Sequence, residues 1–166
     1  IPIIEGSSVG KDYRSDYVSG TPVPITEALG MLYSVSKTLL DVVAPSQKLY
    51  DYVIVDRSLA SFFTYQICTN GYEWMENPFY EVESSTPRGR TVYLTVDPTK
   101  ALERMMTRGV PLDVIEQRGA KYQRHIASSY QECFNYCKRL RPTVTIPTDS
   151  FTLEEVVVRA LSGLEL

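Results

Sequence analysis

The hydrophobic residues of this chain fall into short runs that alternate with longer stretches of helical spacing. Runs rich in β-branched and aromatic residues lie at positions 52–55, 91–96 and 144–146, and Ile3 and Ile4 have the character of the end of another strand. These runs lack strict polar alternation, which is typical of strands in a parallel sheet that is buried on both faces. The pattern therefore predicts a parallel sheet.

Between the runs, four stretches carry apolar residues at the three- and four-residue intervals of a helix: residues 26–43, 98–108, 112–140 and 152–161. We expect Pro45 to end the first helix and Gly109 to end the second. Gly119 predicts a break near the start of the third. Strand–helix alternation of this kind predicts an α/β protein with three layers, α/β/α, around a central parallel sheet, in a single domain over residues 1–166.

Composition and charge disfavour several classes of partner. Seventeen Lys and Arg are scattered along the chain and the net charge is −3, which disfavours a nucleic-acid partner. No apolar run approaches the roughly eighteen residues of a membrane span, and the first residues do not have the pattern of a signal peptide. The three cysteines have no metal-ligand companions, a usage that fits a reducing compartment. We expect a cytoplasmic protein without a membrane partner.

The sharpest candidate for chemistry is Asp56-Arg57, which follows the apolar run 52–55. In parallel α/β sheets, ligands bind at the carboxyl ends of the strands, where this pair is expected to lie. The carboxylate can hold Mg²⁺ through water or orient an attacking oxygen, and the guanidinium can bind two phosphate oxygens at once. An ion pair that merely finishes the strand is the alternative interpretation of these two residues alone.

Residues 56–66 (DRSLASFFTYQ) resemble the thymidylate kinase family, in which a strand ends in Asp-Arg and a Tyr-Gln follows at this spacing. Ser58 departs from the usual Tyr or His. The resemblance implies that Arg57 contacts the acceptor phosphate, that Asp56 lies near the metal and the phosphates, and that Tyr65 packs by the deoxyribose. It assigns substrate binding in this segment to Arg57, Ser61, Tyr65 and Gln66.

Two further segments resemble the same family in the same order. Residues 26–37 (TEALGMLYSVSK) are similar to a helix whose aromatic residue stacks on thymine, a role that falls on Tyr33. Lys37 stands where the family has a base-contacting Arg, and it lacks the planar fork of that residue. Residues 92–98 (VYLTVDP) resemble the strand that leads into the family's lid, which we expect at about residues 108–120.

The lid carries the remaining candidates. Val114 occupies a position where bacterial members often have a transition-state Arg, so that cation is expected from Arg108, with Arg118 or a segment outside the sequence as alternatives. Both arginines also fit the interpretation of solvated helix charges. The resemblance assigns lid roles to Arg104, Arg108, Asp113, Glu116 and Arg118.

A kinase of this kind needs a phosphate-binding loop of the form GxxxxGK[ST]. The only candidate, residues 6–12 (GSSVGKD), is one residue short and ends in Asp. Residues 3–6 resemble the strand that enters the loop, whereas residues 7–14 resemble a much later segment. We therefore expect a strand–helix–strand unit of roughly thirty residues or more, carrying the loop, between Gly6 and Ser7 of the complete protein.

These observations predict an enzyme that transfers a phosphoryl group from ATP, with Mg²⁺, to a deoxynucleoside monophosphate, converting dTMP to dTDP. The resemblance also implies a homodimer. A deoxynucleoside kinase, which acts on a nucleoside hydroxyl, is the nearest alternative. Ser58 favours it slightly, whereas the spacing of Tyr65-Gln66 and the lid-like residues 112–117 favour the monophosphate kinase. A catalytically inactive, kinase-like binding protein is the alternative from another class.

Overall fold

The computed structural model describes residues 1–5, 25–113, 115–137 and 141–164. The chain divides into two compact units, Ile1–Pro87 and Arg88–Leu166. Each unit contains one pair of parallel strands together with several helices. The architecture is therefore mixed α/β with parallel pairing, as the sequence predicts, and the pairing occurs in two two-stranded sheets.

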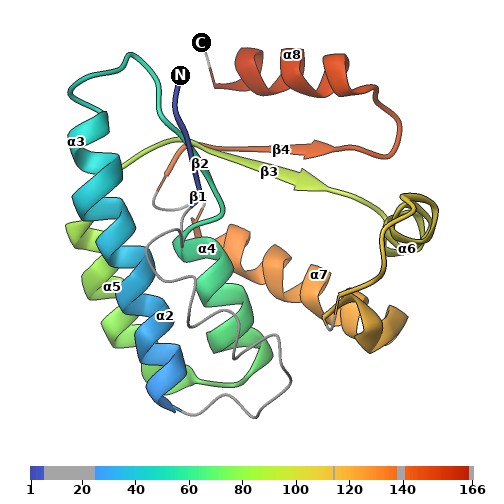
Figure 1. The fold of residues 1–166 in the computed structure, drawn as a ribbon, viewed down its shortest axis with the longest axis horizontal. Coiled ribbons are helices and arrows are strands. Elements are labelled where there is room, and N and C mark those ends of the chain that lie inside the picture. Colours follow the sequence, from blue (N-terminus) through green and yellow to red (C-terminus); the bar gives the residue numbers. More distant parts are fainter. Residues whose placement is uncertain (6–24, 114, 138–140, 165–166) are drawn as a thin grey trace. The chain divides into compact units, whose positions relative to one another are not determined.

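In the first unit, β1 (Ile3–Glu5) pairs in parallel with β2 (Ile54–Asp56), and Glu5 and Asp56 are register partners at the carboxyl end. The helical segments of this unit are α2 (Ile25–Thr38), a π-helical turn (Leu39–Val43), α3 (Ala44–Ser46), α4 (Leu59–Phe62), a second π-helical segment (Phe63–Thr69), a 3₁₀ turn (Glu73–Met75) and α5 (Glu76–Ser85). The elements can be followed by label and colour in Figure 1.

The core of the first unit is the apolar face of α2 and an aromatic cluster. Side chains at three- and four-residue spacing along the first helix are buried: Ala28, Leu32, Val35, Leu39 and Val43. Phe79 of α5 is 2% exposed, and its ring lies 5.0 Å from that of Phe63 and 6.4 Å from that of Phe62. This cluster joins α5 to the helical segment that follows β2, and so supports the residues carried there.

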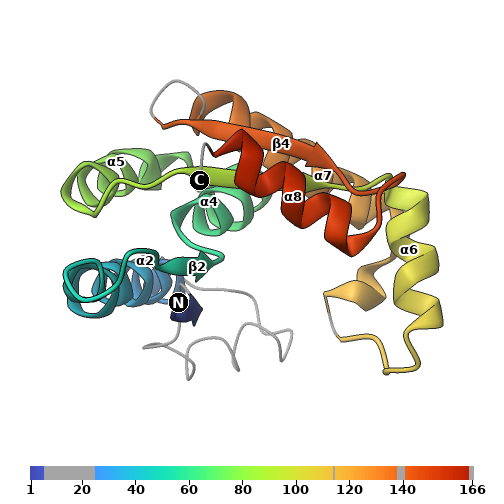
Figure 2. The same cartoon turned by 90° about the horizontal axis from the view of Figure 1, so that it is seen from above.

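In the second unit, β3 (Thr91–Thr95) pairs in parallel with β4 (Thr143–Pro147). The helices are α6 (Pro98–Thr107), a 3₁₀ turn (Glu116–Arg118), α7 (Gly119–Cys137) and α8 (Leu153–Gly163). The ring of Tyr93 stacks on Phe134 of α7 at 3.8 Å, whereas Gly163 of α8 lies against Val144. Tyr93 and Val144 occupy alternate register positions, so α7 and α8 cover opposite faces of the strand pair, as Figures 1 and 2 show.

Most predicted elements are present, with instructive differences. The break at Gly119 is confirmed, since this residue has a φ of +79° between the 3₁₀ turn and α7. Pro45 does not end the first helix, because it takes an early position in α3 where its missing N–H is not needed. The helix α5 was not expected, because few of its residues are apolar; the burial of Phe79 stabilises it.

The expectation that the strands are buried on both faces is wrong. Ile54 is 50% exposed and Leu94 is 52% exposed, although the register partner of Leu94, Ile146, is only 3% exposed. The physical reason in the second unit is that α8 packs on β4. The neighbouring strand β3 keeps part of its apolar surface, including Leu94, in contact with water.

Candidate functional site

The strand β2 ends at Asp56, and the chain turns sharply at the next residue before α4 begins. Arg57 has a φ of +59°, the left-handed conformation that is uncommon for a residue with a side chain. Asp56 and Arg57 are both exposed, and within the described part of the chain no ion pair joins them. This argues against an ion pair that merely finishes the strand. The held backbone conformation is of the kind found at ligand sites.

The helix α2 of the same unit presents Tyr33 and Lys37 about one turn apart. Tyr33 is 60% exposed, so its ring is available for stacking and is not part of the core. Lys37 forms an ion pair with Asp41, which lies one turn further along in the π-helical turn. The hydrogen bond to Asp41 raises the pKa of the Lys37 ammonium above its usual value. Asp41 was not predicted as a site residue, although a Lys and an Asp four residues apart on a helix signal such a pair.

The segment after Arg57 holds the other predicted substrate residues of the first unit. Ser61 lies in α4, and Tyr65 and Gln66 lie in the π-helical segment Phe63–Thr69, a helix form that often occurs at functional sites. Gln66 is fully buried. Its side-chain amide donates to the sulfur of Met31 in α2 at 3.1 Å and accepts from the Asn70 amide at 3.0 Å.

The position of Gln66 has a consequence for its predicted role. Because its amide bonds to α2, this side chain fastens the π-helical segment to the helix that carries Tyr33. The structure therefore brings the two predicted recognition elements of the first unit together, and α2 also packs on α4. Because Gln66 is fully buried, a direct contact between its amide and a substrate requires the surrounding side chains to move.

The carboxyl ends of β3 and β4 form a second polar group. The Asp97 carboxylate caps α6 by accepting the Thr99 backbone N–H at 2.8 Å and that of Lys100 at 3.4 Å, and these bonds hold its pKa below the usual range. The Asp149 carboxylate accepts the Asp97 backbone N–H at 2.9 Å. Arg104 of α6 donates to the carbonyl and hydroxyl oxygens of Thr148, at 2.9 and 3.2 Å.

Thr148 and Asp149 were not predicted from the sequence. The signal that could have found them is their place directly after the strand 144–146, since the ends of parallel strands meet at one edge. Arg104, predicted as a lid residue, lies in α6 and is held by Thr148. Its lid role stays a prediction.

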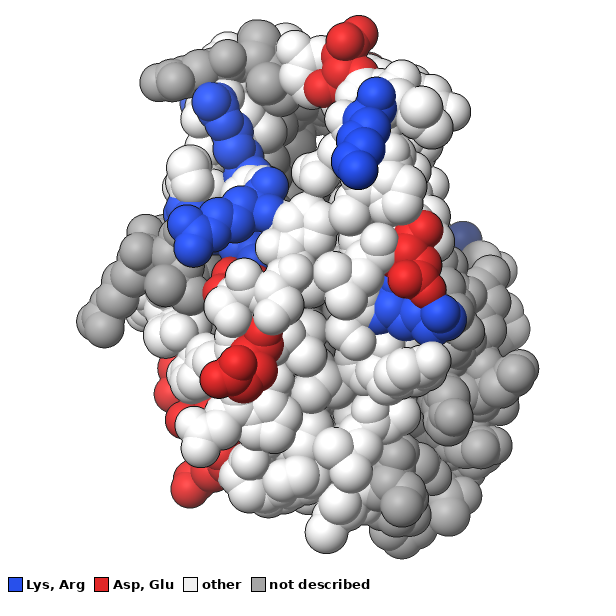
Figure 3. Space-filling view, turned by 90° about the vertical axis from the view of Figure 1, so that its left-hand side faces the viewer, with Lys and Arg blue, Asp and Glu red and all other residues white. Residues whose placement is uncertain are grey.

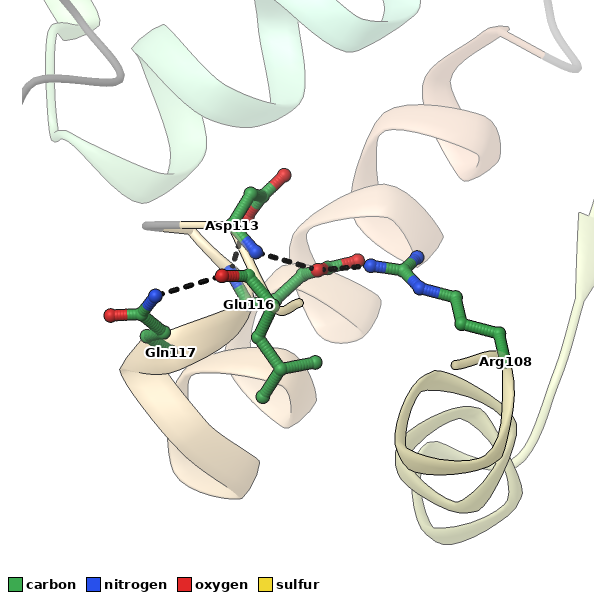
Figure 4. A network of polar contacts seen from close by, with 5 residues as sticks. Arg108, Asp113, Glu116 and Gln117 are labelled. Atoms are coloured by element: carbon green, nitrogen blue, oxygen red, sulfur yellow. Dashed lines mark hydrogen bonds and ion pairs between the residues drawn. The ribbon is translucent and has the colours of Figure 1, made fainter. Parts of the chain in front are cut away.

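Three of the predicted lid residues meet in one network, drawn in Figure 4. Asp113 and Glu116 form a reciprocal cap. The Asp113 backbone N–H donates to Glu116 Oε2 at 2.9 Å, and the Glu116 backbone N–H donates to Asp113 Oδ1 at 2.8 Å. Arg108, at the end of α6, donates to the same Glu116 oxygen at 2.5 Å. Gln117 donates to the Leu112 carbonyl oxygen at 2.8 Å and restrains the same turn.

Arg118 does not join this network. Its guanidinium lies over the ring of Tyr122 in α7, 4.9 Å from the ring centre. Of the two arginines that the sequence offers as a transition-state cation, Arg108 is engaged by a carboxylate and Arg118 by an aromatic face. Val114, the residue that stands in place of the usual Arg, lies outside the described residues, as does the candidate loop at 6–12.

On the face drawn in Figure 3, both basic and acidic side chains are present among uncharged surface. Among the described residues, no three His, Cys, Asp or Glu side chains gather as a metal site. A search of the described helices found none long and apolar enough to cross a membrane.

Comparison with known proteins identifies the family. The chain is similar to a deoxyadenosine kinase from M. mycoides with bound dCTP, at 14% identity and a TM-score of 0.54 over 99% of both chains. The same enzyme with bound dATP matches at 16% identity and a TM-score of 0.48, over 99% of this chain and 98% of that one. At such identities the first likeness shows a shared fold. No curated protein sequence matches the chain. The family model for thymidylate kinase matches residues 5–154, and the chain therefore belongs to the thymidylate kinase family.

Proposed function

We propose that the protein transfers the γ-phosphoryl group of ATP to the phosphate of dTMP, forming dTDP and ADP. In this reaction an oxygen of the acceptor phosphate attacks the γ-phosphorus, and the bond from that phosphorus to the β–γ bridging oxygen breaks. The observation that carries the proposal is the family match over residues 5–154. This range includes Asp56 and Arg57, the polar residues at the carboxyl ends of β3 and β4, and the network around Glu116. Such a transfer needs charge placed around an in-line path more than it needs covalent chemistry.

In the first unit, each predicted acceptor-site residue has one task. Arg57 binds the acceptor phosphate with its planar fork, supported by its exposed position directly after β2. Tyr33 stacks on the thymine ring, supported by its exposure on α2, and Lys37 lies near the exocyclic oxygen. Tyr65 packs by the deoxyribose. Ser61 and Gln66 complete the acceptor site, with Gln66 acting first through its bond to α2.

Mg²⁺ fits the donors at the carboxyl end of β2. This ion prefers oxygen ligands, keeps several waters and is usually held by one or two carboxylates together with substrate phosphates. Asp56 offers an exposed carboxylate at the strand end, and no cluster of three protein ligands occurs among the described residues, so an indirect hold through water suits the site. Mg²⁺ bound there would neutralise phosphate charge, and Asp56 would order the water around it.

In the second unit, Arg108 supplies the cation that stabilises the charge of the transferring phosphoryl group. Residues 108–120 serve as the lid, with Asp113 and Glu116 shaping its turn and with Arg104 and Arg118 at its margins. We propose that both units act as one kinase domain, in a cytoplasmic protein. We also propose a homodimer, which the resemblance to the thymidylate kinase family implies.

A second candidate function is a deoxynucleoside kinase, which the likeness to a deoxyadenosine kinase favours. One experiment separates the two. The intact protein is incubated with ATP and Mg²⁺ and is offered dTMP, thymidine or deoxyadenosine in turn, and the products are resolved by chromatography. Formation of dTDP supports the proposal, whereas phosphorylation of a nucleoside with dTMP left unchanged supports the alternative. No transfer to any acceptor would indicate a kinase-like binding protein.

A further inference from the structure

The carboxylate of Glu116 makes two different kinds of contact at once. Its Oε2 accepts the backbone N–H of Asp113 at 2.9 Å, which closes the cap of the lid turn. The same oxygen accepts from the Arg108 guanidinium at 2.5 Å. One contact shapes the backbone and the other holds a cation that stands at the end of another helix. Figure 4 shows the two contacts converging on this side chain.

The two partners of the ion pair differ in their access to water. The Glu116 side chain is 16% exposed, whereas that of Arg108 is 41% exposed. A carboxylate withdrawn from solvent and fixed by its own cap is a rigid acceptor, and charge-assisted bonds of this type are stronger than neutral ones. The guanidinium carries five N–H donors in a planar fork. Glu116 binds one edge of the guanidinium, and a phosphate can still approach the exposed part of Arg108.

We propose that Glu116 is a positioning residue that orients the Arg108 guanidinium for the phosphates of the reaction. The inference rests on the proposed phosphoryl transfer. Arg108 is the C-cap residue that follows α6, and without a partner its long side chain would sample many rotamers. The pair with Glu116 selects one arrangement before substrate arrives. A guanidinium that is oriented before the substrate binds should raise kcat, because small misplacements of a catalytic group lower the reaction rate.

The two contacts of Glu116 can be separated by substitution. Glutamine serves as well as glutamate at this position of a capping box, so Glu116→Gln keeps the turn and removes the charge that holds Arg108. Glu116→Ala removes both. Glu103→Gln is the matched control, because Glu103 is an exposed carboxylate of α6 whose replacement causes the same change in net charge. Circular dichroism and thermal unfolding of each variant monitor the fold.

The decisive measurement is a kinetic double-mutant cycle on the intact protein with Glu116→Gln, Arg108→Ala and the double variant. We expect Glu116→Gln to lower kcat about tenfold, part of the hundredfold cost known for misplaced catalytic groups, with KM for the acceptor nearly unchanged. In the Arg108→Ala background the same substitution should have no further effect on kcat. Glu103→Gln should retain the wild-type rate.

A binding assay distinguishes failure of this inference from failure of the proposed function. The binding of tripolyphosphate to the wild type, Glu116→Gln, Arg108→Ala and the double variant is measured by calorimetric titration. If the wild type transfers no phosphoryl group but Glu116→Gln weakens tripolyphosphate binding only when Arg108 is present, the proposed function fails and the positioning role stands. Wild-type kcat and binding in Glu116→Gln would overturn the positioning role, as would equal losses with and without Arg108.

Discussion

Arg57 has a left-handed backbone conformation and a predicted contact with the acceptor phosphate. Replacing it with glycine or alanine should separate the effect of the backbone on stability from the loss of the phosphate contact. At a φ of +59° a residue with a Cβ is strained by roughly 1–2 kcal/mol, whereas glycine adopts this conformation freely. Glycine also loses about 0.5–1 kcal/mol more conformational freedom on folding than alanine does. The difference predicts that Arg57→Gly is more stable than Arg57→Ala by about 0.5–1 kcal/mol, although glycine is the less stable choice at most positions.

Both variants lack the guanidinium and should lose activity together. A hydrogen bond to a charged group contributes roughly 1.5–3 kcal/mol, which corresponds to a loss of roughly ten- to hundredfold in kcat/KM for the acceptor. Acceptor KM should rise and kcat should fall, because a misplaced acceptor phosphate lengthens the reaction path. Arg57→Lys should recover only part of the loss, since it keeps the charge without the fork. Asp56→Asn should lower kcat more than it alters acceptor binding.

Two assays on the intact protein test this reasoning. Urea denaturation gives the stability difference between the glycine and alanine variants, provided that the m-value is unchanged. Steady-state kinetics with dTMP gives the functional loss, and Arg124→Ala, which removes an exposed arginine of α7, controls for the change in charge. A glycine variant that is less stable than the alanine variant would refute the strain argument. Wild-type rates in Arg57→Ala would remove this residue from the site.

Three further predictions follow from single features. Tyr33→Ala should weaken acceptor binding by roughly 1–3 kcal/mol and leave ATP affinity unchanged in calorimetric titrations; equal losses for both ligands would contradict stacking on the base. Asp97→Ala should be destabilised relative to wild type at pH 7, and urea midpoints should converge as pH falls through the lowered pKa of this carboxyl, because a depressed folded-state pKa contributes stability only above that range; an undiminished difference at pH 2 would contradict this. The intact mass of the natural protein should exceed 18.8 kDa by that of roughly thirty residues, inserted between Gly6 and Ser7; a mass equal to that of the printed sequence would end this expectation and favour a binding protein.

Local chemistry explains why much of the fold could be predicted. The β-rich runs at 91–96 and 144–146 became β3 and β4, because burial beside a helix and backbone pairing both favour such residues. The break at Gly119 was predictable because glycine adopts a positive φ without strain. The helix α5 was not, since its stability comes from one buried ring packed on residues distant in sequence.

The candidate site also has features that the sequence predicts and features that it does not. By itself, the sequence determined the family, the strand that ends at Asp56, and the order of the segments that carry Tyr33 and the lid. Only the tertiary structure decided how these residues are held: the left-handed turn at Arg57, the buried amide of Gln66 between two helices, and the carboxylate of Glu116 beneath the Arg108 guanidinium. The physical reason is that pattern and propensity act over a few neighbouring residues, whereas hydrogen bonds and ion pairs between elements depend on side chains that only the folded chain brings within reach.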